Sequence, residues 1–173
     1  MSAEAWSVPV AVAEIPETGR KMHLVADAEA RAAVAKLAGV PGVPRLEAMF
    51  ELTRHGKDGL RVTGNVSATV AQNCVVTLEP MTSEIDEAID LLFLPSQETA
   101  SGADQTEAFD DDQPETLRDG VAAVGAIATE FMILGIDPYP RKPGSVFDAP
   151  KTAESSVEHP FAALAALKKD KPS

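Results

Sequence analysis

Cysteine is almost absent from this chain, because Cys74 is the only thiol among 173 residues. A single thiol excludes an intrachain disulfide framework and a multi-cysteine zinc site, and it is typical of a reducing compartment. The chain also lacks the run of about 18 apolar residues that a membrane span needs. Its N-terminal residues, Met1–Trp6, lack the positive region of a secretory signal. We therefore expect a cytoplasmic protein with no membrane contact.

Positive charge is scarce as well. Fifteen Lys and Arg stand against 27 Asp and Glu, which gives a formal net charge of −12. Proteins that coat duplex nucleic acid through charge alone need a cationic surface, because their affinity comes largely from counterion release. This composition excludes that class, and we expect no DNA partner.

Motifs for catalysis and for cofactor binding are missing. The glycines form neither a GxGxxG nor a GxxxxGK[ST] phosphate loop. His23, His55 and His159 lie far apart, with no cysteine or carboxylate at metal-ligand spacing, and Asp110–Asp112 lacks the spacing of a calcium loop. We expect no catalytic residue, no metal and no cofactor.

The N-terminal third predicts a hairpin followed by a helix. Val8, Val10 and Val12 alternate along a strand that ends at Pro16. A second strand, over Lys21–Ala26, would pair with the first one. The Asp27 side chain can then cap a helix over 28–38, which Gly39 ends.

The middle of the chain changes to a period of two. Alternating apolar residues predict strands over Arg45–Thr53 and Leu60–Val70, joined by a glycine-containing loop, and Gly64 indicates a bulge. The next segment, Ile85–Phe93, ends at Pro95 and fits either a strand or a helix.

Between Ser96 and Gly120 the chain carries eight acids and one base. This composition predicts a disordered acidic loop over about 96–118. A strongly apolar helix should follow over Val121–Leu134 and end at Gly135.

Together these patterns predict an α+β fold with a single domain over residues 1–150. We expect an antiparallel, meander-like sheet, open or curled into a partial barrel, with the two main helices packed on it. Residues 151–173 would form a flexible tail that ends in a short C-terminal helix. Strand order and oligomeric state do not follow from these patterns.

Two segments carry the best recognition chemistry. Tyr139 lies between two prolines and is followed by Arg141 and Lys142, which gives a stiff aromatic and cationic patch able to stack on a base or bind a partner side chain. In the tail, Phe161 and Leu164 fall on one face of the expected helix. Each segment also fits a plain structural role: Tyr139 packed on the core, and the tail docked on its own domain.

Three features together resemble one known family, over roughly residues 8–147. Two are motifs, the run Gln72-Asn-Cys-Val-Val-Thr-Leu-Glu-Pro80 and the run Asp137-Pro-Tyr-Pro-Arg141 followed by Pro143-Gly144. The third is the acidic and apolar strand that follows the first motif and ends at Pro95. In order and spacing they resemble the YceD family, in its alphaproteobacterial form. The motif residues that carry the resemblance are Gln72, Cys74, Thr77, Leu78, Glu79, Pro80, Asp137, Pro138 and Pro140.

The YceD family is associated with accumulation of large-subunit ribosomal RNA. The resemblance therefore implies a non-enzymatic factor in ribosome biogenesis, which would bind large-subunit rRNA, a ribosomal precursor particle, or a ribosomal or assembly protein. Other branches of the family carry a second cysteine where Thr77 stands here, so a two-thiol redox or zinc role is closed to this chain.

Three hypotheses follow for the function. The first is a ribosome-biogenesis factor that contacts RNA through a local patch, because the chain outside the acidic loop is still net negative. The second is a protein–protein adaptor with no direct RNA contact. The third, an enzyme that uses Cys74, is disfavoured because Val75, Val76 and Glu79 provide no electropositive setting, so Cys74 is expected to be a packed small hydrophobe.

The acidic loop yields a first testable expectation. Replacing residues 99–113 with a short Gly/Ser linker should leave the melting temperature within a few degrees, because the segment lacks the apolar spacing to join a core. Thermal unfolding followed by circular dichroism measures this, and loss of cooperative unfolding would show that the segment is structural.

Overall fold

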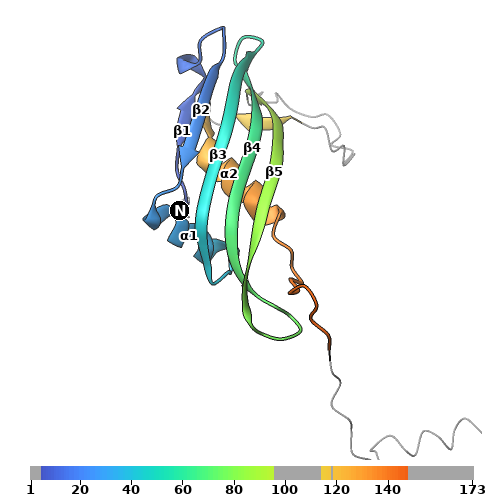
Figure 1. Cartoon of the computed structure of the whole chain (residues 1–173). Helices are drawn as coiled ribbons and strands as arrows, with labels where there is room; N and C mark the ends of the chain where they lie inside the picture. Colours follow the sequence, from blue (N-terminus) through green and yellow to red (C-terminus); the bar gives the residue numbers. More distant parts are fainter. Residues whose placement is uncertain (1–4, 96–113, 118, 148–173) are drawn as a thin grey trace, which may run out of the picture.

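The computed structural model describes residues 5–95, 114–117 and 119–147, and these residues have an α+β architecture (Figure 1). Along the chain the elements are β1 Pro9–Ala11, the short 3-10 helix η1 Val12–Glu14, β2 Arg20–Val25, α1 Ala28–Ala38, β3 Gly42–His55, β4 Gly59–Asn73, β5 Pro80–Pro95, β6 Glu115–Leu117, β7 Val121–Ala123 and α2 Val124–Leu134. The expected C-terminal helix lies outside the described residues.

The main sheet has five strands in the order β2-β3-β4-β5-β6. The first four pair antiparallel with their neighbours in chain order, which confirms the meander, whereas β6 pairs parallel with β5. Because β2 and β6 do not pair, the sheet is open and mixed rather than a closed barrel. No helix of the described residues is long and apolar enough to cross a membrane.

The core lies between one face of this sheet and α2. Alternate residues of β3 and β4 are buried, and α2 crosses behind the strands in Figure 1. The largest fully buried side chains come from the N-terminal segment, α1, the sheet, α2 and the β4–β5 loop: Ile15, Val34, Leu46, Leu52, Leu60, Val62, Val66, Val70, Cys74, Val124 and Met132. Helix α1 packs against β3.

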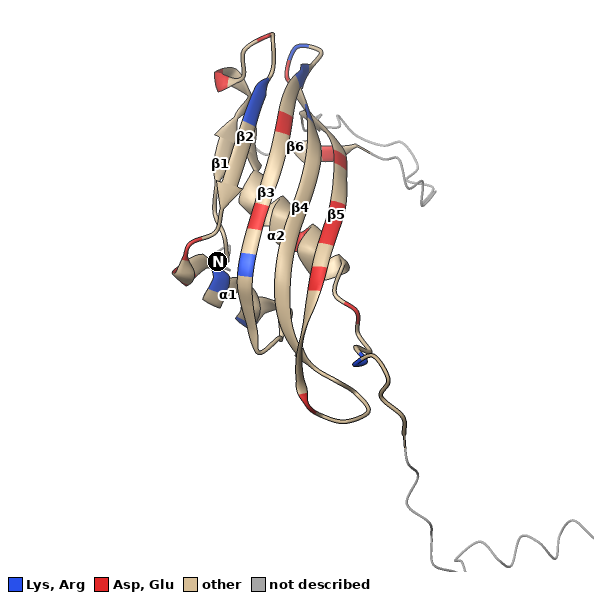
Figure 2. Cartoon of the chain, viewed as in Figure 1, with Lys and Arg blue, Asp and Glu red and all other residues tan. Residues whose placement is uncertain are grey.

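Figure 2 shows charged residues along β3, β4 and β5. The alternating burial of these strands puts the exposed polar and charged positions on the face opposite the core. The Arg45 guanidinium bonds to the carboxylates of Glu47 and Glu84, and Arg61 holds Asp90 through two hydrogen bonds of 2.8 and 2.9 Å. Hydrogen bonds lower the pKa of all three carboxyl groups: from His23 and then Arg45 for Glu47, from Thr69 and then Arg45 for Glu84, and from Arg61 for Asp90. Each of these exposed ion pairs contributes little to the free energy of unfolding. Most of the stability therefore comes from the apolar core on the other face of the sheet.

Helix α1 confirms the local prediction at both ends. The Asp27 carboxylate accepts a hydrogen bond of 2.8 Å from the Ala30 N–H, and Gly39 takes a left-handed conformation with φ 67°. Both are standard ways to satisfy the free backbone groups at a helix end.

The predicted first hairpin is wrong. The strand expected over residues 8–15 is only the three residues of β1, which pairs antiparallel with β7 in a separate two-stranded sheet. Hydrogen bonds from Val124 N to Val8 O and from Val12 N to Gly120 O continue this contact. Strand β2 pairs with β3 instead. The reason is that Val10 and Val12 are buried and that β1 packs against α2, more than a hundred residues away in sequence.

Three further expectations need correction or completion. The segment over 85–93 is a strand, within β5, and not a helix. Helix α2 begins at Val124, because Val121–Ala123 form β7. The end of the expected acidic loop is structured, because β6 pairs with β5 and Leu117 is buried. The rest of that loop, 96–113, lies outside the described residues.

Gly64 does not mark a bulge. It pairs in register with Phe50 on β3 and Ile89 on β5, and the register shift in β3 lies between Gly42 and Arg45. Gly64 has φ 157°, and a Cβ there would lie 1.9 Å from the Met49 carbonyl oxygen. Glycine is needed because the β3 backbone approaches closely.

Replacing this glycine should therefore destabilise the fold strongly. We expect Gly64→Ala to lower the free energy of unfolding by roughly 3 kcal/mol, at the upper end of overpacking costs. The control is Gly56→Ala, where φ is 63° but the Cβ would meet nothing within 4 Å, so that only the backbone cost of about 1–2 kcal/mol applies. Urea denaturation measures the free energy of unfolding of both variants. If Gly64→Ala and Gly56→Ala lower it equally, the close approach of the β3 backbone to Gly64 is contradicted.

Candidate functional site

The two sequence motifs meet in space. The loop between β4 and β5 lies against the chain that follows α2, at the lower end of the sheet in Figure 1. The Val75 N–H donates to the Pro140 carbonyl oxygen at 2.9 Å, and the Lys142 N–H donates to the Cys74 sulfur at 3.4 Å. We call residues 72–80 the first loop, residues 137–142 the second loop, and both together the two-loop site.

Gln72 fastens the second loop to the sheet. Its side chain is buried, the Nε2 donates to the Asp137 carbonyl oxygen at 2.8 Å, and the Oε1 accepts from the Ser83 hydroxyl at 2.8 Å. Gln72 lies on the same face of β4 as the core residue Val70. The apolar face of the sheet thus ends in a polar contact that holds the chain leaving α2.

Cys74 is fully buried, which confirms the expected packing. Its setting differs from the expectation that no neighbour would stabilise a thiolate. Hydrogen bonds from the Thr77 hydroxyl, and from backbone N–H groups that include Lys142, lower the pKa of the Cys74 thiol to about 6. The strongest of these backbone donors is 68 residues away in sequence, which is why the flanking residues gave no sign of it.

Glu79 and Lys142 form the charged contact between the loops. The Lys142 Nζ lies 3.0 Å from Glu79 Oε2, and this ammonium group lowers the pKa of the Glu79 carboxyl. The Thr77 hydroxyl is also 3.3 Å from the same oxygen. Since a hydroxyl has one hydrogen, Thr77 donates either to Glu79 or to the Cys74 sulfur at a given moment.

The second loop presents an aromatic side chain. The Asp137 carboxylate accepts a hydrogen bond of 2.8 Å from the Tyr139 N–H, and Pro138 and Pro140 restrict the backbone on both sides. Pro140 is buried against the first loop, whereas the Tyr139 side chain is 71% exposed. Tyr139 therefore does not pack on the core, and the loop holds it toward solvent.

The remaining candidate residues have varied positions. Arg141 is exposed and makes no hydrogen bond or ion pair with the described residues. Pro80 begins β5, and Leu78, two residues before it, is 77% exposed. Phe161 and Leu164 lie outside the described residues. Ser83 was missed, because a single serine in a strand carries no signal of a buried partner.

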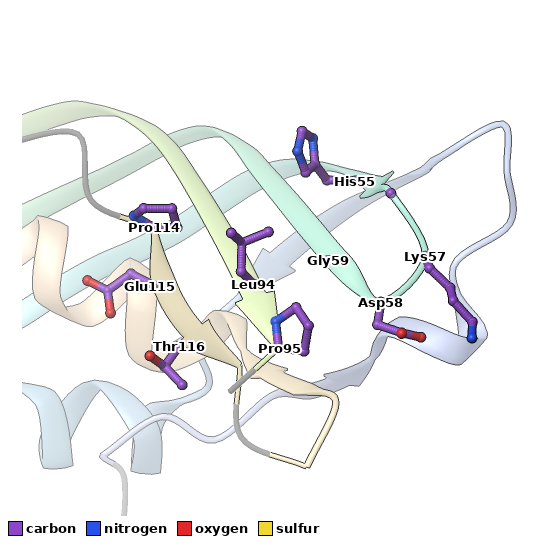
Figure 3. A pocket seen from close by; sticks show the side chains of 10 residues that line it. His55, Lys57, Asp58, Gly59, Leu94, Pro95, Pro114, Glu115 and Thr116 are labelled. Carbon is purple, nitrogen blue, oxygen red and sulfur yellow. The ribbon is translucent and has the colours of Figure 1, made fainter. Parts of the chain in front are cut away.

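A cleft lies at the other end of the sheet, by the β3–β4 hairpin (Figure 3). It has a volume of about 550 Å³, and its lining includes His55, Lys57, Asp58 and Glu115. Figure 3 shows these side chains spread around the opening rather than converging on one point. Among the described residues no group of three His, Cys, Asp or Glu could hold a metal ion. The two-loop site is the better candidate.

The comparisons with known proteins point to one family. The family model described as large ribosomal RNA subunit accumulation protein YceD matches residues 62–168, which include both loops of the site. No curated protein and no solved structure matches the chain.

The role of Gln72 can be tested by removing its hydrogen bonds at similar volume. We expect Gln72→Met to lower the free energy of unfolding by about 1–3 kcal/mol, because the Asp137 carbonyl and the Ser83 hydroxyl lose their partner. The second loop should also open, so trypsin should cut after Arg141 faster than in the parent protein. Asn73→Met, at the adjacent exposed position, is the control. An unchanged cleavage rate would show that Gln72 does not hold this loop.

Proposed function

This chain belongs to the YceD family of large ribosomal RNA subunit accumulation proteins, and from that membership we propose that it acts without catalysis, by binding large-subunit rRNA or an assembling ribosomal particle. The proposed contact is the two-loop site. Such a role places the protein in the cytoplasm, where its single thiol stays reduced.

One observation carries this proposal: the polar groups of the motif residues are bonded within the two-loop site itself. Gln72 and Cys74 are buried and bonded to the second loop, and Glu79 is paired with Lys142. What they leave exposed are an aromatic side chain and a cation, Tyr139 and Arg141, on a restrained backbone. A loop whose backbone is already ordered loses less entropy on binding, which favours recognition.

The charge distribution limits the kind of contact. The polar face of the main sheet carries five carboxylates, from Glu47, Glu51, Glu84, Asp86 and Asp90, against the cations Lys21, Arg45 and Arg61. That face repels phosphate. Binding to a particle that contains RNA therefore has to be local, and the two-loop site offers the required combination of aromatic ring and guanidinium.

The test is co-sedimentation of the tagged protein with large-subunit precursors. We expect Arg141→Glu to weaken association by roughly 1–3 kcal/mol, as for a lost charge-assisted contact, with the thermal midpoint almost unchanged. The matched control is Lys57→Glu, an exposed cation in the β3–β4 loop at the other end of β4, which should bind normally.

Two outcomes would contradict these assignments, and one further treatment identifies the kind of partner. If Arg141→Glu unfolds the protein, Arg141 braces the fold and the site assignment is wrong. If the parent protein does not sediment with precursors, the proposed function is wrong. Treatment of the particles with nuclease before sedimentation separates RNA-dependent binding from an adaptor that contacts protein alone.

A further inference from the structure

Leu78 has a backbone conformation that leucine rarely adopts. Its φ of 61° lies in the left-handed region, which is unfavourable for an L-residue with a side chain and is usually occupied by Gly, Asn or Asp. The conformation is fixed by two hydrogen bonds of the loop, Leu78 N to Cys74 O at 2.8 Å and Cys74 N to Glu79 O at 2.9 Å. The only other non-glycine residue with positive φ in the described part of the chain is Asp119, a type that tolerates it.

The leucine side chain contributes little to the fold in return. It is 77% exposed, so it buries little apolar area. A glycine or asparagine here would keep the loop and remove the strain. Strained positions that the fold does not need tend to occur at functional sites.

Other exposed apolar side chains lie on the same pair of loops. Val75 is 43% exposed and Tyr139 is 71% exposed, and the Val75–Pro140 hydrogen bond joins the two loops that carry them. Gln72 fastens the second loop to β4, and the Lys142–Cys74 bond joins the two loops. We call Leu78, Val75 and Tyr139, the exposed apolar side chains of these joined loops, the Leu78 anchor.

The charges around the Leu78 anchor favour protein over RNA. Lys142 is neutralised by Glu79, which leaves Arg141 as the exposed cation of the described site. Binding to RNA phosphates commonly involves several cations, whereas an apolar group beside one arginine complements an apolar protein surface that has a carboxylate at its edge.

We propose that the Leu78 anchor docks a protein component of the assembling particle, whose contact surface presents apolar side chains and one carboxylate that pairs with Arg141. This inference rests on the proposed function, because it names the partner of the same site. It also explains why the loop keeps leucine at a position where the backbone favours glycine.

The test separates the side chain from the backbone. Leu78→Asn and Leu78→Gly should keep or raise the melting temperature, because the left-handed conformation suits both residues, and should weaken binding to precursor particles about tenfold or more. Leu78→Ala should weaken binding equally. The control is Leu37→Ala, which removes a leucine that is 63% exposed on α1 and should bind normally.

The class of partner is identified with a photo-crosslinking residue at Asn73, which is exposed at the end of β4 and leaves Leu78 and the Thr77 hydroxyl in place. The proposal is supported if the protein forms a crosslinked adduct on precursor particles that protease destroys and nuclease does not. The same adduct should be absent when Leu78→Asn is introduced. An adduct with RNA overturns the proposal. Binding should also depend weakly on salt, whereas a steep decline between 50 and 200 mM salt would indicate phosphate contacts and overturn it.

The two proposals fail in different ways. If the parent protein sediments with precursors and Leu78→Asn sediments equally well, the Leu78 anchor is wrong and the proposed function stands. If the parent protein does not sediment with precursors, both are wrong.

Discussion

The packing of α2 across the apolar face of the sheet is the contact on which the rest of the structure depends. It buries Val124, Ala128 and Met132, and it brings the end of the helix against β5. The approach is close enough that a Cβ on Gly135 would lie 2.7 Å from Ile85 Cγ2. Since the chain leaves the helix at this point, the same packing delivers the second loop to the first one.

Local physics allowed part of the fold to be predicted. Helix α1 is flanked directly by its capping residue, Asp27, and by the glycine that ends it, Gly39. In β3 and β4, buried and exposed residues alternate with a clear period of two. In contrast, Ile85 and Ile89 fit either a strand or a helix, and pairing with β4 decided the outcome. The partner of β1 could not be predicted, because β7 is more than a hundred residues away.

The candidate site shows the same division. The motif residues could be found from order and spacing, and so could the stiffness of the segment around Tyr139. Their connections could not, because the bonds from Gln72 to Asp137 and from Lys142 to Cys74 each span more than sixty residues. The conformation of Leu78 gave no signal either, since positive φ is normally read from glycine or asparagine and here belongs to a leucine.

Helix α2 also acts as a spacer of fixed length. Its 11 residues span roughly 16 Å, and the next few residues lead directly to the carbonyl of Asp137 that Gln72 binds. One residue added within the helix would shift everything after it by about 1.5 Å and turn it by about 100°. With the buried face of α2 kept against the sheet, the chain that follows would then be displaced from its partners Gln72 and Cys74. Substitutions on the exposed side of this helix are therefore easier to accommodate than insertions or deletions, and its length is under a stricter constraint than its composition.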